Sequence, residues 1–351
     1  MTKSVQFTGR KMVLTAMILI LALFASACGG SQTTDNSAAP APETNTNTPS
    51  EAPTDTAAQE EIPLNIGTLK IAALTNLYAA DKLGYFKEEG LKVTFTQMGG
   101  GAELLPAVSA GQIDITLSIP SPAIQAREKG FDFKMVMQNE ISAKEGEDSQ
   151  AIFVRADSGI NGLQDLKGKQ LAVNNIGNQT WLAFVEVLEM NGVDKKDVNF
   201  LELPFPNMED ALVNKQIDAV YNVEPFTSKM LTNADLKAIS YPATESLPGQ
   251  PAGAFWASEK WLASNGQTAE KFVNAMKKAT AYLAEHPEET NTLIAEYTGL
   301  PPAMIESMKP IIWTSEVEQD TLQGLLDLMK KHGLLEKEMK VEEILHPTAL
   351  Q

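Results

Sequence analysis

The stretch that decides the fold is Gln112–Pro122, QIDITLSIPSP, because a second version of it, QIDAVYNVEPF, stands at 216–226. Each copy follows an apolar helical pattern, opens with Gln-Ile-Asp and continues as a short apolar strand. Each then ends at a proline, where a strand should stop. The copies lie about 100 residues apart, which is too long a period for a solenoid. The pattern predicts two similar α/β lobes.

Strands and helices alternate around both copies. Short apolar runs at 69–74, 93–98, 113–119, 171–173, 200–203 and 217–223 are typical of buried strands. Helical patterns at 79–89, 102–110 and 181–190 separate them, and this alternation favours mostly parallel sheets. Further strands are expected at 133–138, 151–154 and 253–258, after which the chain is helical. The predicted fold class is α/β.

Length and composition exclude several classes of protein. The chain of 351 residues is long enough for about two domains. Its 43 % apolar and 21 % charged residues are typical of a soluble globular protein. A net charge of −17 argues against nucleic acid and anionic membrane surfaces as partners.

The amino end has the pattern of an export signal. Basic residues at 3, 10 and 11 precede an apolar run at 12–24, which is too short to cross a bilayer as a helix. Ala25-Ser-Ala27 supplies small residues for cleavage, so residues 1–27 are predicted to be a signal peptide. The only cysteine, Cys28, follows at once. This stretch is similar to bacterial lipoprotein signals, which implies lipidation of Cys28; ordinary cleavage after Ala27 is the alternative.

Residues 28–62 are predicted to form a tether between Cys28 and the folded core. From 29 to 62 the chain is rich in Ser, Thr, Asn, Pro, Ala and Glu and lacks Lys and Arg. Such a composition buries too little apolar surface to offset the entropy of ordering, which predicts disorder. The folded core is therefore expected to begin at Pro63.

Motifs for metals, cofactors and nucleophilic catalysis are missing from the sequence. His286, His332 and His346 are too scattered for a metal-ligand motif and are expected at the surface or at helix ends. Neither a nucleophile elbow nor a Walker loop is present. The glycines at 99–101 follow a strand and open a helix, but Leu104 stands where a dinucleotide motif needs its third glycine. We therefore expect no metal, no cofactor and no catalytic residue.

The loops after the strands are the candidate binding site. In open α/β sheets, ligands bind beyond the carboxyl ends of the strands, where helix N-termini offer free N–H groups. These loops carry many neutral hydrogen-bonding side chains and a single charge, Glu224. Ser121 and Thr180 are also plausible helix N-caps, and Glu224 could instead pair with a basic residue. The candidate ligand-binding residues are Asn76, Tyr78, Gly100, Gly101, Ser118, Ser121, Asn175, Asn178, Thr180, Tyr221 and Glu224.

Five motifs resemble those of one protein family. They are LGYFKEEGL at 83–91, VSAGQID at 108–114, PSPAIQ at 120–125, LQDLKG at 163–168 and QIDA at 216–219. With them the chain resembles the substrate-binding proteins of bacterial ABC importers for nitrate, sulfonates and taurine, and the related pyrimidine-precursor binding proteins. The resemblance covers about residues 66–260.

The resemblance implies a two-lobe periplasmic-binding-protein-like fold of type II, with a hinge and a ligand cleft. Lobe 1 would comprise residues 63–154 and 256–351, and lobe 2 residues 155–255. The chain would cross between the lobes near 151–157 and 253–258. The resemblance also places candidate residues in binding loops: Asn76 and Tyr78 in the first, Ser118 and Ser121 in the second, Asn178 and Thr180 at a helix start, and Glu224 beside the hinge.

The function implied is that of a monomeric lipoprotein on the extracytoplasmic face of the cell membrane. It would bind a small molecule and deliver it to an ABC permease and its ATPase. Glu224 favours a zwitterionic sulfonate of the taurine kind over a simple anion, with an aminopyrimidine as the alternative. Some eukaryotic relatives are pyrimidine synthases that use a cysteine cluster, which this chain lacks. Binding is therefore expected rather than catalysis, and a binding-only sensor is a further alternative.

Overall fold

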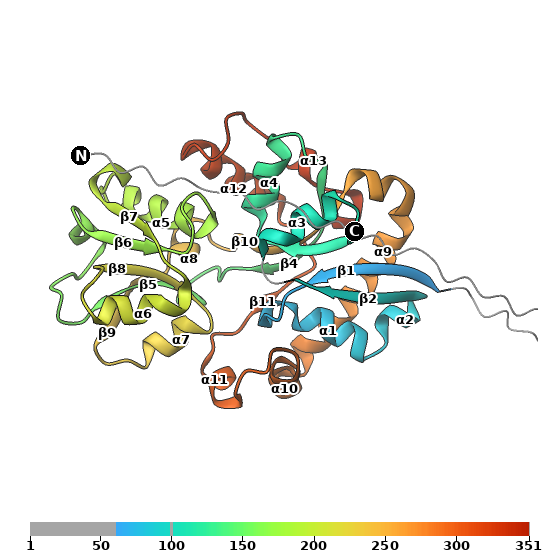
Figure 1. The fold of residues 1–351 in the computed structure, drawn as a ribbon, viewed down its shortest axis with the longest axis horizontal. Helices are drawn as coiled ribbons and strands as arrows, with labels where there is room; N and C mark the ends of the chain where they lie inside the picture. Colours follow the sequence, from blue (N-terminus) through green and yellow to red (C-terminus); the bar gives the residue numbers. More distant parts are fainter. Residues whose placement is uncertain (1–60, 99–100, 351) are drawn as a thin grey trace, which may run out of the picture. The chain divides into compact units, whose positions relative to one another are not determined.

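The computed structural model describes residues 61–98 and 101–350. The predicted signal peptide, Cys28, the tether up to residue 60 and Gly100 lie outside these residues. The described chain contains two β-sheets with helices packed around them (Figure 1). Among its helices, none is long and apolar enough to cross a membrane.

The first sheet has six strands in the order β11–β4–β10–β3–β1–β2. β1 pairs in parallel with β2 and β3, whereas β10 runs antiparallel to β3 and β4, and β11 antiparallel to β4. The bounds are β1 Ile62–Thr68, β2 Leu91–Gln97, β3 Ile115–Ser118, β4 Phe133–Ile141, β10 Pro251–Ser258 and β11 Ile312–Trp313.

The second sheet has five strands in the order β7–β6–β8–β5–β9. β6 pairs in parallel with β7 and β8, and β5 runs antiparallel to β8 and β9. The bounds are β5 Gln150–Arg155, β6 Gln170–Val173, β7 Asn199–Glu202, β8 Ala219–Val223 and β9 Leu236–Ser240. Apart from β11, the strands of the first sheet correspond in order to those of the second, with the two Gln-Ile-Asp strands, β3 and β8, in the same central place. This confirms the two similar α/β lobes that the repeat predicts.

Helices cover the sheets and extend the chain after β10. In the core between the first sheet, α2 and α9, Phe272 stacks on Phe86 and makes an edge-to-face contact with Phe255. The bounds are α1 Thr75–Lys82, α2 Tyr85–Glu88, α3 Gly101–Ser109, α4 Pro120–Glu128, α5 Gln179–Met190, α6 Phe205–Val213, α7 Phe226–Leu231, α8 Pro242–Ser246, α9 Glu259–Glu285, α10 Pro287–Thr298, α11 Pro302–Ser307, α12 Gln319–Lys331 and α13 Val341–Ile344. Short 3-10 helices lie at 72–74, 163–166, 195–197 and 347–350.

The predicted mostly parallel sheets are both mixed, because each contains strands that run against the others. In each sheet, the strand that follows directly after a strand of the other sheet pairs with the Gln-Ile-Asp strand and is antiparallel to it. These strands are β10 in the first sheet and β5 in the second. The chain therefore crosses between the sheets within 142–149 and 241–250, and the crossings expected near 151–157 and 253–258 are wrong. We propose lobe boundaries at these crossings in place of those expected at 154/155 and 255/256.

The predicted strand at 69–74 is also wrong. The strand lies earlier in the chain, at β1. Residue 75 already opens α1, so the first binding loop, expected to contain Asn76 and Tyr78, is helical. The sequence of β1 lacks a continuous apolar run, because Asn65 and Gly67 interrupt the apolar residues. Asn65 donates its side-chain N–H to the carbonyl of Gln112, and a Cβ on Gly67 would lie 2.3 Å from Ile113. The tether prediction therefore extends too far, since Ile62 already pairs with Leu91.

Candidate functional site

A cavity of about 620 Å³ opens between the two sheets. The first sheet contributes the loop after β1, at 70–73, together with Ile119 and Glu140. The second sheet contributes the start of α5 at 178–180 and the turn after β8 at 224–226. Residues from the carboxyl-terminal part of the chain, including Met308 just after α11, line a further side. The volume is that of a typical small-molecule site.

Asn178 and Thr180, both predicted ligand contacts, lie in the cavity wall at the start of α5. Asn178 is the N-cap of this helix and accepts a hydrogen bond from the N–H of Trp181 at 3.0 Å. Thr180 donates to the side-chain oxygens of Asn174 and Asn178, each at 2.7 Å. The expected alternative, Thr180 as the cap, is wrong because Asn178 takes that place. This network fixes a polar corner of the cavity.

Tyr221 lies in the wall on β8, as predicted. Its hydroxyl donates to Oε1 of Gln150 at 3.0 Å. Burial, followed by the charges of Asp148 and Glu245, raises the pKa of Tyr221 well above its ordinary value. The phenol therefore stays protonated and is a fixed neutral group.

Glu224 also lies in the wall, but its carboxylate is bonded within the protein. Oε1 accepts hydrogen bonds from the Ser228 hydroxyl at 2.7 Å and the Lys309 N–H at 3.0 Å, and Oε2 accepts from the Ser228 N–H at 3.2 Å. Burial raises the pKa of Glu224, against the lowering effect of these bonds. Glu224 thus links α7 to the segment after α11, and its contact is with the backbone of Lys309 rather than with a basic side chain.

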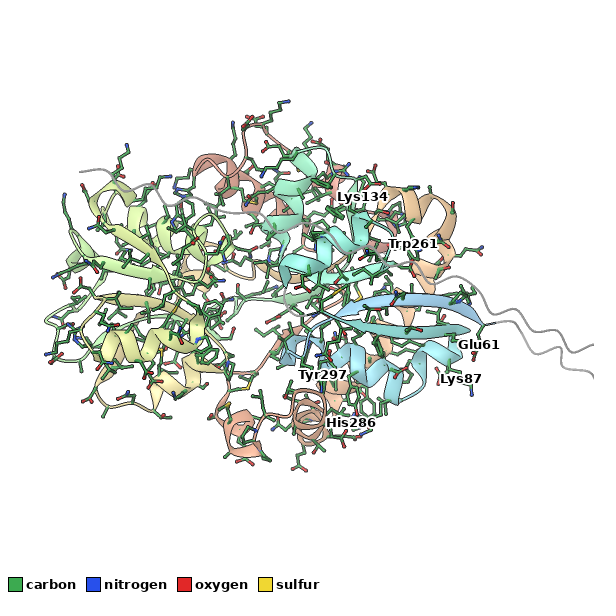
Figure 2. All side chains as sticks on the ribbon, viewed as in Figure 1. Glu61, Lys87, Lys134, Trp261, His286 and Tyr297 are labelled. Atoms are coloured by element: carbon green, nitrogen blue, oxygen red, sulfur yellow. The ribbon has the colours of Figure 1, made fainter. Side chains whose placement is uncertain are left out.

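The first binding loop is not brought to the cavity. Asn76 is fully buried on α1 and donates to Oδ1 of Asn139 at 2.8 Å and to the hydroxyl of Thr280 at 3.3 Å. Tyr78 stacks on Tyr297, labelled in Figure 2, with ring centroids 5.4 Å apart. Both side chains hold α1 against the carboxyl-terminal helices.

Four other predicted residues lie outside the cavity wall. The hydroxyl of Ser118 donates to the Ile119 carbonyl, and that of Ser121 is fully buried. Ser121 is not a cap either, because α4 begins at Pro120 with Ile119 as its N-cap. Asn175 donates to Glu202 on the second sheet. Gly101 begins α3, and Gly100 lies outside the described residues.

Sequence analysis missed two charged residues of the wall, Glu140 and Lys70. Burial, followed by the charge of Asp148, raises the pKa of Glu140 to about 7. In the described part of the chain, neither its carboxyl nor the Lys70 ammonium has a hydrogen-bond or ion-pair partner. Both residues stand at strand ends, at β4 and just after β1, so the rule that selected the other loops could have found them had these strands been placed correctly.

Gln179 is a third missed wall residue. Its side-chain amide donates to Oε1 of Gln250 at 3.1 Å and to the Pro251 carbonyl at 2.5 Å. Its own oxygen is buried and has no partner among the described residues. Gln179 is therefore anchored to Gln250 and the start of β10, and its unpartnered oxygen is buried at the wall.

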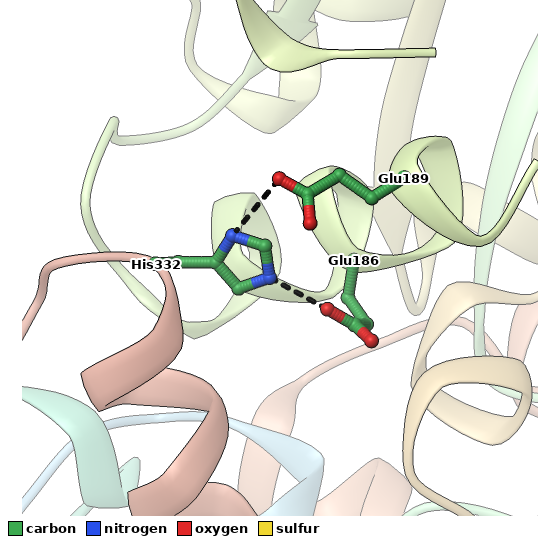
Figure 3. A group of neighbouring side chains, drawn as sticks. All are labelled: Glu186, Glu189 and His332. Atoms are coloured by element: carbon green, nitrogen blue, oxygen red, sulfur yellow. Dashed lines mark hydrogen bonds and ion pairs between the residues drawn. The ribbon is translucent and has the colours of Figure 1, made fainter. Parts of the chain in front are cut away.

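A polar cluster away from the cavity joins α5 to the end of α12. Figure 3 shows the imidazole of His332 between the carboxylates of Glu186 and Glu189, with distances of 2.6 Å and 3.7 Å. His332 stands at a helix end, as expected, but it is buried rather than at the surface. These donor types can bind metal ions, but Glu186 already has an ion-pair partner in Lys331 and a hydrogen-bond partner in the His332 ring. The cluster is a contact between helices.

Comparisons with known proteins agree with this architecture. A binding protein of Bacillus subtilis, YtlA, is 24 % identical over 298 residues, covering 79 % of this chain and 87 % of that protein. The formylaminopyrimidine-binding protein of Halalkalibacterium halodurans is 25 % identical over 280 residues, covering 79 % and 80 %. The crystal structure of the periplasmic aliphatic sulphonate binding protein SsuA from Escherichia coli superposes with a TM-score of 0.68 at 20 % identity, covering 81 % and 97 %.

The two sheets thus form the periplasmic-binding-protein fold that the sequence motifs imply. The profile of one family, described as NMT1/THI5 like, matches residues 72–290, which is more than half of the chain. The matched part includes both Gln-Ile-Asp strands and most of the cavity wall. The chain therefore belongs to the NMT1/THI5-like family.

Proposed function

We propose that this protein is the extracytoplasmic binding component of an ABC importer. The observation that carries the proposal is the cavity whose walls come from both sheets, since a ligand touching both would favour their closure around it. A closed complex would then be recognised by the permease. In this proposal the protein acts as a monomer and performs binding without chemistry.

Attachment to the membrane through lipidated Cys28 completes the proposal. The signal-like stretch before Cys28 supports it. In the native host, Cys28→Ser should release the protein from the membrane fraction while leaving ligand affinity intact. Unchanged partition of the variant into the detergent phase would contradict a lipid anchor at this residue.

The first candidate ligand is a zwitterionic sulfonate of the taurine kind. The cavity contains acidic and basic side chains together, which suits a ligand bearing both charges. An aminopyrimidine is the second candidate, because three aromatic side chains, Phe205, Tyr221 and Phe226, line the wall. Such rings provide apolar faces for a planar heterocycle.

Native mass spectrometry of protein purified without refolding tests the function directly. We expect a retained small molecule, released on unfolding, that rebinds in calorimetry without turnover. Conversion of the retained molecule to a product would instead favour an enzyme. Failure to retain or bind any small molecule, including taurine and an aminopyrimidine, would contradict the proposal.

A further inference from the structure

Glu140 is the free acidic group of the cavity. It lies near the end of β4, where its backbone pairs with Gly253 on the crossing strand β10. β4 and β3 both run antiparallel to β10, so Glu140 stands at the same sheet edge as the end of β3. Its side chain lines the cavity and has no hydrogen-bond or ion-pair partner in the described chain. A carboxyl left without a partner at a cavity wall is available to a ligand.

Lys70 is the free basic group of the same cavity. It follows β1, which runs parallel to β3 and therefore ends at the same edge as β4. In the strand order, β10 and β3 separate β4 from β1. Three strand spacings place the two backbones on the order of 14 Å apart, a gap that the two side chains shorten from either end.

Two further polar side chains of the wall, Glu224 and Tyr221, already have partners within the protein. Glu224 accepts three hydrogen bonds from Ser228 and Lys309, and Tyr221 donates to Gln150. The charge that a ligand can engage without breaking a protein contact is therefore concentrated at Glu140 and Lys70. Between them the wall is largely apolar and aromatic.

We propose that Glu140 and Lys70 bind the two ends of a dipolar ligand, a protonated amine or amidine at Glu140 and an anionic group at Lys70. This inference rests on the proposed binding function and names the ligand class of that site. It moves the acidic contact from Glu224, the residue that the sequence suggests, to Glu140. Sulfonates, carboxylates and phosphonates are equivalent here as the anionic end.

The ionisation of Glu140 agrees with this arrangement. Burial raises its pKa to about 7, so the carboxyl is readily protonated when no cation lies beside it. A cation beside it would hold it ionised and form a charge-assisted hydrogen bond. The charge of Asp148 acts on it, and the titratable groups of Tyr221, Glu224 and Lys70 line the same cavity.

Paired probes with and without an amine provide the test. Taurine would be compared with 2-hydroxyethanesulfonate, and 3-aminopropanesulfonate and 4-aminobutanoate with their hydroxyl analogues, by calorimetry at pH 8. Wild-type protein should prefer at least one amine over its analogue by about tenfold or more. Glu140→Gln should reduce that preference to about one. Lys70→Met should weaken the binding of an aminated acid and the binding of its hydroxyl analogue by the same factor.

The matched controls are Glu145→Gln and Lys92→Met, which are exposed changes outside the cavity wall. Both should bind as wild type does. Two results would overturn the inference while leaving the binding function standing. One is an amine preference that persists in Glu140→Gln, and the other is a co-purified molecule that lacks either an amine-type or an anionic group. If the protein retains no molecule and binds none of the probes, the proposed function itself fails.

Discussion

The two copies of the Gln-Ile-Asp stretch have the same local structure but different surroundings at their far ends. Asp114 accepts the backbone N–H of Asn65 at 2.8 Å and donates its own N–H to the Asn65 carbonyl at 2.8 Å. Asp218 makes the same pair of contacts with Gln170, both at 2.9 Å. In each lobe the aspartate ties the central strand to its parallel neighbour, β1 in the first sheet and β6 in the second. The motif that marks the family is therefore scaffold.

The copies diverge after the strand ends. The first ends at Ser118, whose hydroxyl donates to the neighbouring Ile119 carbonyl. The second ends one residue later relative to its aspartate and presents Glu224, which holds Ser228 and Lys309. Duplication thus explains the framework, whereas the character of the cavity comes from residues outside the repeat.

The largest expected effect comes from the residue after each aspartate. Ile115 is fully buried in the core against α9, while the second copy has only Ala219 there. Ile115→Ala should lower the free energy of unfolding by about 2–5 kcal/mol, measured by denaturant titration. The reverse change, Ala219→Ile, should cost about 1–3 kcal/mol by overpacking. If Ile115→Ala lowers the free energy of unfolding by less than about 1 kcal/mol, the packing around Ile115 does not distinguish the first core from the second.

The second prediction contrasts β4 and β9, which occupy corresponding places beside β10 and β5. β4 presents the unpartnered Glu140, whereas β9 ends at Ser240, whose hydroxyl donates to Glu245 at 2.8 Å. The pKa of Glu140 is raised from 4.5 to about 7, so folding favours its protonated form. This contribution to stability is complete below pH 4.5 and is lost as the pH rises through about 7.

Glu140→Gln should therefore raise the free energy of unfolding at pH 8 by about 1–3 kcal/mol and leave it unchanged at pH 4. Unfolding curves of ligand-free protein across this range would measure the difference. Other titratable groups lie near Glu140, namely Asp148, Tyr221, Glu224 and Lys70. The pH profile of each variant is therefore compared with that of the wild type. Ser240→Ala is the control and should show no such pH dependence. Equal pH profiles for wild type and Glu140→Gln would contradict a raised pKa.

The third prediction tests the shared aspartate contact. Asp114→Ala and Asp218→Ala should each lower the free energy of unfolding by about 1–2 kcal/mol, because each leaves a strand N–H without its acceptor. The Asp114 change should cost more, since its bond is partly buried and that of Asp218 is exposed. Gln112→Ala and Gln216→Ala serve as controls and should stay within about 0.5 kcal/mol. Equal losses for all four changes would refute a special role for the aspartates.

Much of the framework could be predicted because its signals are local. Apolar runs locate most strands, and the repeated Gln-Ile-Asp places β3 and β8 correctly. β1 was displaced because Asn65 and Gly67 break its pattern for reasons that lie in distant partners, Gln112 and Ile113. The direction of the crossing strands was missed for a similar reason, since no local pattern says whether a strand pairs in parallel.

The cavity was only partly predictable. Asn178, Thr180, Tyr221 and Glu224 follow or lie on correctly placed strands, and all four line the wall. Glu140 reaches the wall through the pairing of β4 with β10, a contact between residues far apart in sequence. Whether a side chain is free also depends on distant contacts, as the bond from the Lys309 N–H to Glu224 illustrates.

The smallest expected effect concerns the helices that follow the two repeats. Ser121 on α4 and Thr227 on α7 are fully buried, and no described residue provides a hydrogen-bond partner for either hydroxyl. A buried hydroxyl without a partner contributes a desolvation cost, so removing it should be neutral or slightly stabilising. Ser121→Ala and Thr227→Val should change the free energy of unfolding by no more than about 0.5 kcal/mol.

Neither change should alter ligand affinity, because neither residue lines the cavity. The matched control is Ser228→Ala on α7, one residue after Thr227. Its hydroxyl donates to Glu224 at 2.7 Å, so this change should cost about 1–2 kcal/mol. Thermal unfolding and calorimetry with the co-purified molecule would separate the three variants. A loss of affinity in Ser121→Ala alone would mean that the first lobe contacts the ligand through the residue that the sequence suggests, and that the repeats differ in function more than their buried hydroxyls indicate.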